Sequence, residues 1–284
     1  MSAEPSICIT IPFHSNVGYL DEALRSLVAQ SDPDWTAIVV DDAGPLPAAA
    51  TVDALADPRL RCLRNPVNLG VAGNFNRCLE VGGEVADVVV VLHADDVLEP
   101  GFVATIRRAH RRFLEAAIVA TRVTVIDSAG DPVRTLGDSA KRRMWPRHLP
   151  FTLRGDRGLA RLVSGQFLYC PAASYRVDKL PALRFDSRWQ QVMDLDLFAR
   201  ILLADEAVVL VPDRVYRYRR HADSMSARNT RAGLRHREEV AVTEEIVAAA
   251  RRRRWRRTVL AGRLRVTVRV NAALARLDVT RSRT

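Results

Sequence analysis

Two adjacent carboxylates, Asp95 and Asp96, follow an apolar run at 88–92 that predicts a buried strand. Neighbouring carboxylates repel each other unless a cation or hydrogen-bond donors neutralise them. Carboxylates are typical ligands of Mg²⁺ and Mn²⁺, and Mg²⁺ commonly combines one or two of them with substrate phosphates. The pair therefore predicts a metal site for a phosphorylated ligand. A solvated turn with an aspartate at the cap of the next helix is the alternative.

A second carboxylate pair, Asp41 and Asp42, ends the strand-like run at 37–40 in the same way. Carboxylates at that position can accept hydrogen bonds from a base and a ribose. The segment 64–74 then joins a strand to a helix and carries two glycines, Gly70 and Gly73. Free backbone N–H groups at the start of such a helix can hold a pyrophosphate. Each pattern by itself is equally typical of an ordinary turn.

Two positions in the second half offer acid–base and ligand chemistry. Asp194 and Asp196 begin a helical segment, where the helix dipole stabilises negative charge. If Asp196 serves that purpose, Asp194 remains as a free carboxylate before the helix and can act as a general base. His221 follows a strand-like run and can contact a metal or a phosphate. A purely structural histidine is the alternative.

These residues need a framework that brings them to one edge of a sheet. In the first half, β-branched runs alternate with amphipathic helical patterns, which predicts a layered α/β domain. We expect strands at 7–11, 37–40, 60–63, 88–92 and 118–126, and helices at 20–28, 75–81 and 100–113. The segment 12–14 and both carboxylate pairs then lie at the carboxyl ends of strands, where open α/β sheets bind ligands.

The second half of the chain is less regular. Segment 131–158 is rich in Pro, Arg and Gly and predicts an irregular loop region. Helical patterns recur at 194–203 and 235–250, and 208–211 is strand-like. The segment 264–270 fits a strand and a helix about equally, so both remain open.

Composition limits the class of protein. The 284 residues are 48% hydrophobic and 27% charged, which is typical of one globular domain, with or without an appendage. No apolar run approaches the roughly 20 residues that span a bilayer, and the first residues show no secretory signal. The four cysteines form no CxxC pair, which predicts reduced thiols in a cytosolic protein.

The net charge of +10 is concentrated at the end of the chain. Residues 251–284 hold twelve Arg against one acid, Asp278, so the body is nearly neutral. Basic residues beside apolar ones suit an anionic membrane surface. Packing on the domain and formation of a homodimer are the alternatives. We expect no nucleic-acid partner, because Trp255 is the one aromatic residue of this tail and offers little stacking capacity.

The order of the motifs resembles the GT-A fold and the family 2 glycosyltransferases over residues 6–225. The motifs are Pro12-Phe13-His14, Asp41-Asp42, Asn68-Leu69-Gly70, His93-Ala94-Asp95-Asp96, Asp194-Leu195-Asp196 and Tyr218-Arg219-Arg220-His221. The resemblance implies an α/β domain that binds a nucleotide-diphosphosugar through a mostly parallel central sheet flanked by helices. It also implies Mn²⁺ or Mg²⁺ and inversion at the anomeric carbon. We expect a helical C-terminal extension after this domain.

The resemblance carries over residue by residue. It assigns donor contacts to Pro12, Phe13, His14, Asp41, Asp42, Asn68, Gly70 and Asp95. Asp96 is implied as the more direct metal ligand, and His221 as a residue that approaches the metal or the diphosphate. Asp194 is implied as the general base.

Three departures from the family pattern affect these roles. His93 stands where the metal motif usually has its leading Asp, and Ala43-Gly44 stands where Gly-Ser is usual. Met193 replaces the acid that commonly precedes the base, which leaves Asp194 without a like-charged neighbour to raise its pKa. No Gln-x-x-Arg-Trp sequence occurs, so we do not expect a processive polymer synthase.

We therefore predict a metal-dependent inverting glycosyltransferase with a UDP-, dTDP- or GDP-sugar donor and a glycan, lipid-linked or small-molecule acceptor. The resemblance implies work in bacterial cell-surface polysaccharide or glycoconjugate biosynthesis, in the cytoplasm or at the inner face of the plasma membrane. We expect residues 1–225 to form the catalytic domain, divided into a nucleotide-sugar half (1–100) and an acceptor half (101–225), and 226–284 to form the basic extension. A natural-product glycosyltransferase and a degenerate nucleotide-sugar-binding protein are the alternatives.

Overall fold

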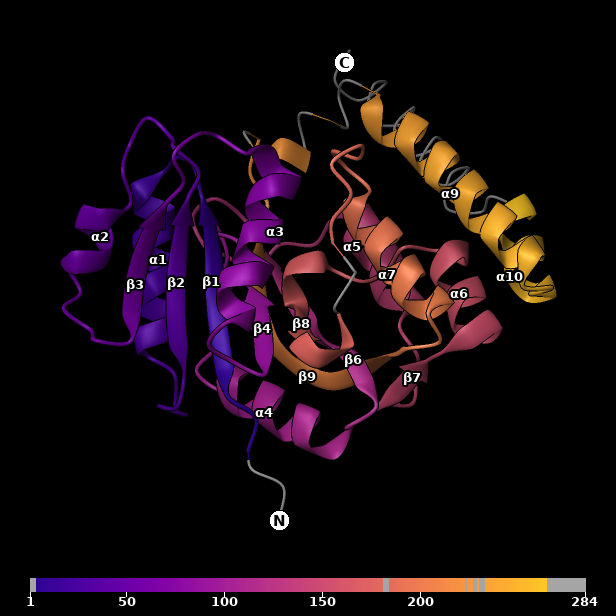
Figure 1. Cartoon of the computed structure of the whole chain (residues 1–284), viewed down its shortest axis with the longest axis horizontal. Coiled ribbons are helices and arrows are strands. Elements are labelled where there is room, and N and C mark those ends of the chain that lie inside the picture. Colours follow the sequence, from indigo (N-terminus) through magenta and orange to yellow (C-terminus); the bar gives the residue numbers. More distant parts are fainter. Residues whose placement is uncertain (1–3, 181–183, 223, 227–228, 230–232, 265–284) are drawn as a thin grey trace.

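The computed structural model describes residues 4–180, 184–222, 224–226, 229 and 233–264 (Figure 1). Most of the segment 264–270, for which strand and helix remained open, lies outside the described residues. Within the described ranges, no helix combines the length and the hydropathy needed to cross a bilayer.

Nine strands of the described chain form one sheet. Their bounds are β1 Ile7–Phe13, β2 Thr36–Asp41, β3 Leu60–Arg64, β4 Val88–Val91, β5 Val97–Leu98, β6 Ala116–Ile126, β7 Phe151–Leu153, β8 Ala173–Arg176 and β9 Ala207–Arg219. The five strands expected in the first half are confirmed. β8 was not predicted, because its four residues lack a long apolar run.

Helices connect and cover these strands. They are α1 Val17–Val28, α2 Ala49–Asp53, α3 Gly70–Gly83, α4 Phe102–Arg112, α5 Leu136–Met144, α6 Gly155–Ser164, α7 Met193–Leu203, α9 Leu234–Arg252 and α10 Arg256–Leu264, with 3₁₀ turns at Cys170–Ala172 and Val177–Lys179. The expected helices of the first half are confirmed, although α3 begins at Gly70, before the start expected near Gly73-Asn74.

The strand order across the sheet is β3-β2-β1-β4-β8-β6-β9-β5, with β7 beside β9. β1 pairs in parallel with β2 and β4, β2 with β3, and β6 with β9. β8 is antiparallel to both of its neighbours, β4 and β6, so β4 and β6 run in the same direction. Six strands therefore share one direction, and the mostly parallel sheet is confirmed.

The two faces of the sheet carry separate hydrophobic cores, because successive strand residues point to opposite sides. On one face, Ile9 of β1 packs with Leu24 of α1 and Ile106 of α4. On the other, Val89 of β4 belongs to a core that also holds residues of helices α3, α6, α7 and α9, for example Phe75 and Leu197. These layers place the carboxyl ends of the neighbouring strands β2, β1 and β4 along one edge of the sheet.

The segment 131–158 is ordered, and the prediction of an irregular loop was wrong. It forms α5, β7 and the start of α6. The Oγ1 of Thr135 accepts the backbone N–H of Asp138 at 3.1 Å, which is an N-cap. Asp138 also accepts hydrogen bonds from Arg220 Nε at 2.8 Å and Tyr169 OH at 2.7 Å. Contacts with residues distant in sequence therefore hold a polar helix that composition alone did not predict.

The described part of the basic extension packs on the body of the protein. α9 lies against α7, and α10 lies against α6 and α9 (Figure 1). The carboxylate of Asp156, in α6, accepts the backbone N–H groups of Thr258 at 2.8 Å and Arg257 at 3.1 Å and so caps α10. The division expected after residue 225 therefore does not separate these two helices from the body, while the side chains of Arg256 and Arg257 remain exposed.

Candidate active site

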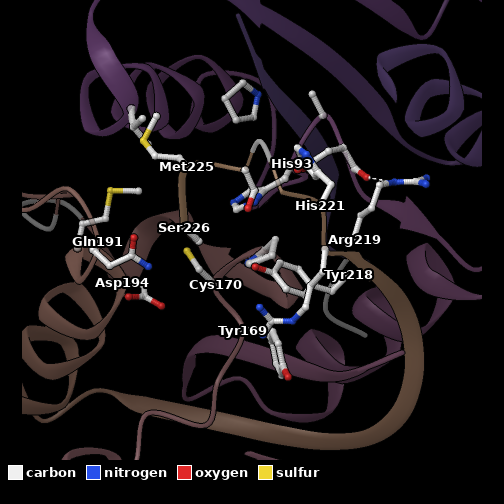
Figure 2. Close-up of a pocket in the computed structure, with 18 of the residues that line it drawn as sticks. His93, Tyr169, Cys170, Gln191, Asp194, Tyr218, Arg219, His221, Met225 and Ser226 are labelled. Carbon is white, nitrogen blue, oxygen red and sulfur yellow. Dashed lines mark hydrogen bonds and ion pairs between the residues drawn. The ribbon is translucent and has the colours of Figure 1, made fainter. Parts of the chain in front are cut away.

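A cavity of about 710 Å³ lies at the carboxyl ends of β1, β4 and β9. Its other walls come from α5, the segment 166–171, α7 and α9. Figure 2 shows Gln191 and Asp194 on one side of this cavity and His93 and His221 on the other. Of the predicted site residues, the cavity is lined by Pro12, His14, Asp95, Asp194 and His221, and not by Phe13, Asp41, Asp42, Asn68, Gly70 or Asp96.

Asp95 and His221 form a pair that faces the cavity. Asp95 follows β4, and its Oδ2 lies 3.0 Å from Nε2 of His221, which follows β9. The Asp95 side chain is 31% exposed. Burial opposes its ionisation, but the hydrogen bond and the charge of His221 favour it, and the pKa of Asp95 lies below its usual range. An ionised carboxylate is thus presented to the cavity beside an imidazole.

Asp96, expected as the more direct metal ligand, is fully buried instead. Its Oδ2 accepts a hydrogen bond from Tyr216 OH at 2.8 Å, and its Oδ1 accepts the backbone N–H of Arg219 at 2.7 Å. Burial and the charge of Asp95 raise the pKa of Asp96 well above its usual range. Both oxygens tie the turn after β4 to β9, so the structure favours Asp95 over Asp96 as the residue that meets a metal.

The residues around Asp95 fit a divalent cation. Ligand atoms of His93, Asp95 and Asp96 lie within 4.8 Å of one another. His93 Nε2 is buried and has no hydrogen-bond partner among the residues described. Burial lowers the pKa of His93, which favours the neutral ring that can bind a metal. Because Asp96 is committed elsewhere, Asp95 is the carboxylate ligand that this group offers, and donor phosphates can complete the coordination of Mn²⁺ or Mg²⁺.

Arg219 braces the turn that carries Asp95. Its side chain is almost fully buried and forms an ion pair with Glu22 of α1. Its Nε donates to the carbonyl of Asp95 at 2.7 Å, and a terminal nitrogen donates to the carbonyl of Ser128 at 3.1 Å. The guanidinium therefore joins α1, the metal turn and the loop after β6, which fixes the position of the Asp95 backbone.

His14, one of the predicted donor-contacting residues on the cavity wall, directly follows β1. Its Nδ1 lies 3.3 Å from Nδ2 of Asn68. The Oδ1 of Asn68 accepts the backbone N–H of Gly70 at 2.8 Å, and Gly70 has a φ of +71°, which favours glycine. Asn68 and Gly70 thus shape the loop beside His14, and their direct contact with a donor stays a prediction.

Asp41 organises the loop after β2. Its carboxylate accepts the backbone N–H of Ala48 at 3.1 Å and pairs with Arg64 at 2.6 Å. Within this loop, a Cβ on Gly44 would lie 1.7 Å from the carbonyl oxygen of His14. Glycine is therefore required for the loop to pack against the backbone of His14.

Asp42 and Phe13 are also committed to the fold. Oδ1 of Asp42 accepts the backbone N–H of Leu69 at 2.8 Å and the side-chain amide of Asn65 at 2.9 Å. Phe13 is 1% exposed and packs in the hydrophobic core under α1. The Phe13 side chain therefore faces the core and not the cavity, and the donor contact expected at this residue stays a prediction. The physical reason is strand alternation, which directs Phe13 to the same face as Ile9 and Ile11.

Asp194 stands in the first turn of α7, across the cavity from His221 (Figure 2). Its Oδ1 accepts the backbone N–H of Leu195 at 2.8 Å, and its Oδ2 accepts the side-chain amide of Gln166 at 3.0 Å. Burial raises the pKa of Asp194 and outweighs the opposing charge of Lys141. Burial therefore raises the pKa of Asp194 as a neighbouring acid would, although position 193 is a methionine.

Lys141 is a cavity residue that the sequence interpretation missed. It comes from α5, in the segment expected to be a loop. Its Nζ lies 4.2 Å from the ring centroid of Tyr169, and burial lowers its pKa to about 8. One signal was available: Lys141 and Lys179 are the two lysines of a chain otherwise rich in arginine.

α9 also supplies part of the cavity wall, although it was assigned to the extension. Arg235 and Glu239 line the cavity and pair with each other at 2.8 Å. The carboxylate of Glu238 accepts the backbone N–H groups of Gln190 and Gln191, at 3.0 and 2.8 Å. α9 therefore holds the loop that leads directly into the turn with Asp194.

Comparison with known proteins gives the family. The sequence model of glycosyl transferase family 2 matches residues 8–181. The uncharacterized protein MT1568 of Mycobacterium tuberculosis is 36% identical over 108 residues, which cover 37% of this chain and 33% of MT1568. The succinoglycan biosynthesis protein ExoW of Rhizobium meliloti is 32% identical over 111 residues, or 38% of this chain and 34% of ExoW. Each match spans about a third of the relative's length.

Solved structures share the fold at low sequence identity. TarS of S. aureus in complex with UDP-GlcNAc superposes with a TM-score of 0.65 and 15% identity, over 86% of this chain and 66% of that chain. The mannosyltransferase PcManGT of Pyrobaculum calidifontis, in complex with GDP-Man and Mn²⁺, superposes with a TM-score of 0.65 and 15% identity. The superposition covers 96% of this chain and 74% of the mannosyltransferase chain. The GT-A-type α/β fold predicted from the sequence is confirmed.

Proposed function

This chain belongs to glycosyl transferase family 2, and on that premise we propose that it moves a sugar from a nucleotide-diphosphosugar to an acceptor hydroxyl, with a divalent metal and inversion. One observation carries the proposal. A single cavity holds the ionised carboxylate of Asp95 beside His221 on one side and the carboxylate of Asp194 on the other. Metal-assisted transfer needs these two functions on opposite sides of the sugar.

Asp194 acts as the base in this proposal. It takes the proton of the acceptor hydroxyl while that oxygen forms a bond to the anomeric carbon. The bond from this carbon to the diphosphate oxygen breaks on the opposite face, and its electron pair leaves with the nucleoside diphosphate. A divalent metal, when bound, supplies positive charge that offsets the charge developing on this leaving group. Asp95 and His93 would hold it, with His221 beside Asp95, and Mn²⁺ and Mg²⁺ both stay open.

The donor end of the cavity lies beside His14 and Pro12. The two solved structures above are complexes with UDP-GlcNAc and with GDP-Man, and we propose a UDP-, dTDP- or GDP-sugar for this chain. The acceptor, whether glycan, lipid-linked or small molecule, would approach from the side of Asp194. The succinoglycan protein among the relatives supports a setting in bacterial surface polysaccharide or glycoconjugate synthesis, with a natural-product pathway as the alternative.

The direct test is release of nucleoside diphosphate from a panel of UDP-, dTDP- and GDP-sugars, measured with the full chain and Mn²⁺ or Mg²⁺. We expect release from one donor class that stops on chelation of the metal, and a product whose anomeric configuration, measured by NMR, is opposite to that of the donor. Binding of a donor without any turnover, with or without acceptors, would indicate the degenerate binding protein instead.

The exposed arginines near α10 support a second part of the proposal, attachment to an anionic membrane at the inner face of the plasma membrane. Leu260 and Leu264 are 60% and 50% exposed on the same helix, and side chains four residues apart share a helix face. Each basic residue near an anionic surface contributes about 1 kcal/mol of binding. Packing of α10 on α6 leaves this face available, so the alternative of a homodimer through the same face must be tested beside it.

Liposome co-sedimentation distinguishes these alternatives. We compare the full chain with a variant in which Arg252, Arg253, Arg256 and Arg257 are changed to Gln, in anionic and in neutral vesicles. The proposal expects the unchanged chain to sediment with anionic vesicles at low salt and the variant to remain in the supernatant. Equal recovery of both in the supernatant contradicts it, and a concentration-dependent change in sedimentation without lipid indicates a dimer.

A further inference from the structure

A second cavity, of about 370 Å³, lies on the other side of α5 from the first. Tyr169 lines both cavities, Lys141 of α5 lines the first, and Arg142 of the same helix lines the second. The wall between them is held by Asp138, which pairs with Arg220 from the first cavity at 2.6 Å. The two cavities are therefore neighbours that share one helix and one tyrosine.

Four arginines line this second cavity: Arg122, Arg134, Arg142 and Arg214. The one acid in its lining, Asp138, is neutralised by Arg220 and is 7% exposed. Arg122, Arg134 and Arg142 form no ion pair within the described part of the chain, and Nε of Arg122 is buried there without a hydrogen-bond partner. Burial and the charges of Arg122 and Arg142 lower the pKa of Arg214. The cavity therefore holds positive charge that no residue of the described chain offsets.

The remaining lining is apolar and aromatic. Val123 and Val125 of β6 and Val133 form part of the wall, and the Arg122 guanidinium lies 5.6 Å from the ring centroid of Trp145. Arginine side chains bind phosphate oxygens in pairs through their planar donors, which is stronger than a single neutral hydrogen bond. A phosphate group would match the positive charge of the four arginines, and a carbon skeleton attached to it would match the apolar part of the cavity wall.

We infer that this second cavity binds a phosphate or diphosphate group, and that the group belongs to the acceptor substrate. The first part stands on the geometry of the cavity alone, and the second rests on the proposed function. An acceptor anchored by its phosphate beyond α5 would reach the first cavity past Tyr169 and Lys141. Lys141 interacts electrostatically with Asp194, so this entry leads to the side of the proposed base and away from His14 at the donor end.

Binding is tested with inorganic pyrophosphate by calorimetry on the full chain in EDTA, so that no metal-dependent donor site contributes. We expect Arg142→Gln and Arg214→Gln each to weaken pyrophosphate binding about tenfold or more, the loss of one charge-assisted contact. Arg143→Gln is the matched control, because Arg143 is exposed on the same helix and lines neither cavity. Both test residues are exposed, so these variants are expected to fold.

A second arm identifies the source of the phosphate. Farnesyl diphosphate in detergent that binds at least tenfold more tightly than pyrophosphate, with the same loss in Arg142→Gln, supports a lipid-linked acceptor. Equal affinities support a soluble phosphorylated acceptor. Unchanged pyrophosphate binding in both arginine variants overturns the inference. So does an equal loss of UDP and GDP affinity in Mn²⁺, which would assign these arginines to the donor. Absence of transferase turnover, by contrast, affects only the proposed function.

Discussion

The two sides of the active-site cavity are built by different means. On the side of β1, β2 and β4, carboxylates are fixed by backbone groups: Asp41, Asp42 and Asp96 each accept at least one backbone N–H. On the side of α5, α7 and α9, backbone N–H groups also hold Asp194 and Glu238, but burial and contacts between side chains are added, as for Arg235 with Glu239. We call the first side the rigid side, because backbone groups hold its carboxylates, and it presents the ionised carboxylate of Asp95 to the cavity. We call the second side the tuned side, because burial and neighbouring charges shift the pKa values of Asp194 and Lys141.

The largest expected effect tests the tuned side. Asp194→Asn should lower kcat by about 10²–10⁴-fold, the usual contribution of a general base, and should leave donor affinity unchanged. Steady-state kinetics and donor titration measure the two quantities. Asp196→Asn is the matched control, because Asp196 lies on the same helix, pairs with Arg200 and does not line the cavity. A parallel loss of donor affinity in Asp194→Asn would move this residue to the donor site.

The next test separates two neighbours on the rigid side. Asp95→Asn should weaken Mn²⁺ binding by at least about tenfold, as titrated by electron paramagnetic resonance, because it removes the carboxylate that faces the cavity. Asp96→Asn should instead lower the free energy of unfolding by about 1–3 kcal/mol, because the amide keeps one acceptor oxygen and must either lose the N–H of Arg219 or donate to Tyr216 OH in place of accepting from it. If Asp96→Asn is stable and loses Mn²⁺ while Asp95→Asn retains it, Asp96 is the more direct metal ligand, as the family pattern implied.

Much of the rigid side could be predicted from the sequence. Its strands are continuous apolar runs, and the helices between them have clear stripes such as Leu20, Leu24 and Leu27. Parallel strands bring their carboxyl ends together, so Asp95 and His14 could be assigned to one edge. The sequence pattern could not predict the direction of each side chain within the turn after β4. The structure shows that Asp95 points to the cavity and that Asp96 is buried.

The tuned side was much harder to predict. α5 is polar and is held by long-range contacts of Asp138 with Tyr169 and Arg220, which no local pattern reveals. The residues that surround Asp194 therefore come from segments whose position depends on the finished fold. Its raised pKa likewise depends on burial, a property of the assembled cavity. The sequence predicted the role of Asp194 through a family resemblance and not through its environment.

The pH dependence of activity tests whether burial raises the pKa of Asp194 while the charge of Lys141 lowers it. The base must be ionised, so activity should fall as pH decreases through its raised pKa. In Lys141→Met, the positive charge that favours the carboxylate is gone, and the acid limb of the kcat profile should move to higher pH. Lys179→Met, which alters the other lysine outside the cavity, is the control. An acid limb at the same pH in Lys141→Met would show that Lys141 does not influence the base.

The smallest effect concerns the cap that joins α6 to α10. Asp156→Ala should lower the free energy of unfolding by about 0.5–2 kcal/mol, as for other N-caps, measured by urea denaturation. Burial opposes ionisation of Asp156, but hydrogen bonds from Thr258 and Arg257 outweigh it and lower its pKa. This stabilisation is therefore present above the usual pKa of aspartate and is lost as the pH falls further. Asp178→Ala is the control, and an equal effect there would contradict the cap.

The hydrogen bonds from Gln190 and Gln191 to Glu238 have a consequence for recombination between related enzymes. The loop that enters the turn with Asp194 depends on an acceptor in α9, so the segment after residue 225 is not an interchangeable module. A chimera that joined residues 1–225 to an unrelated end would leave two N–H groups near the base without their partner. Crossover points after α10 preserve this contact, and shuffled libraries cut there should retain function more often than libraries cut at 225.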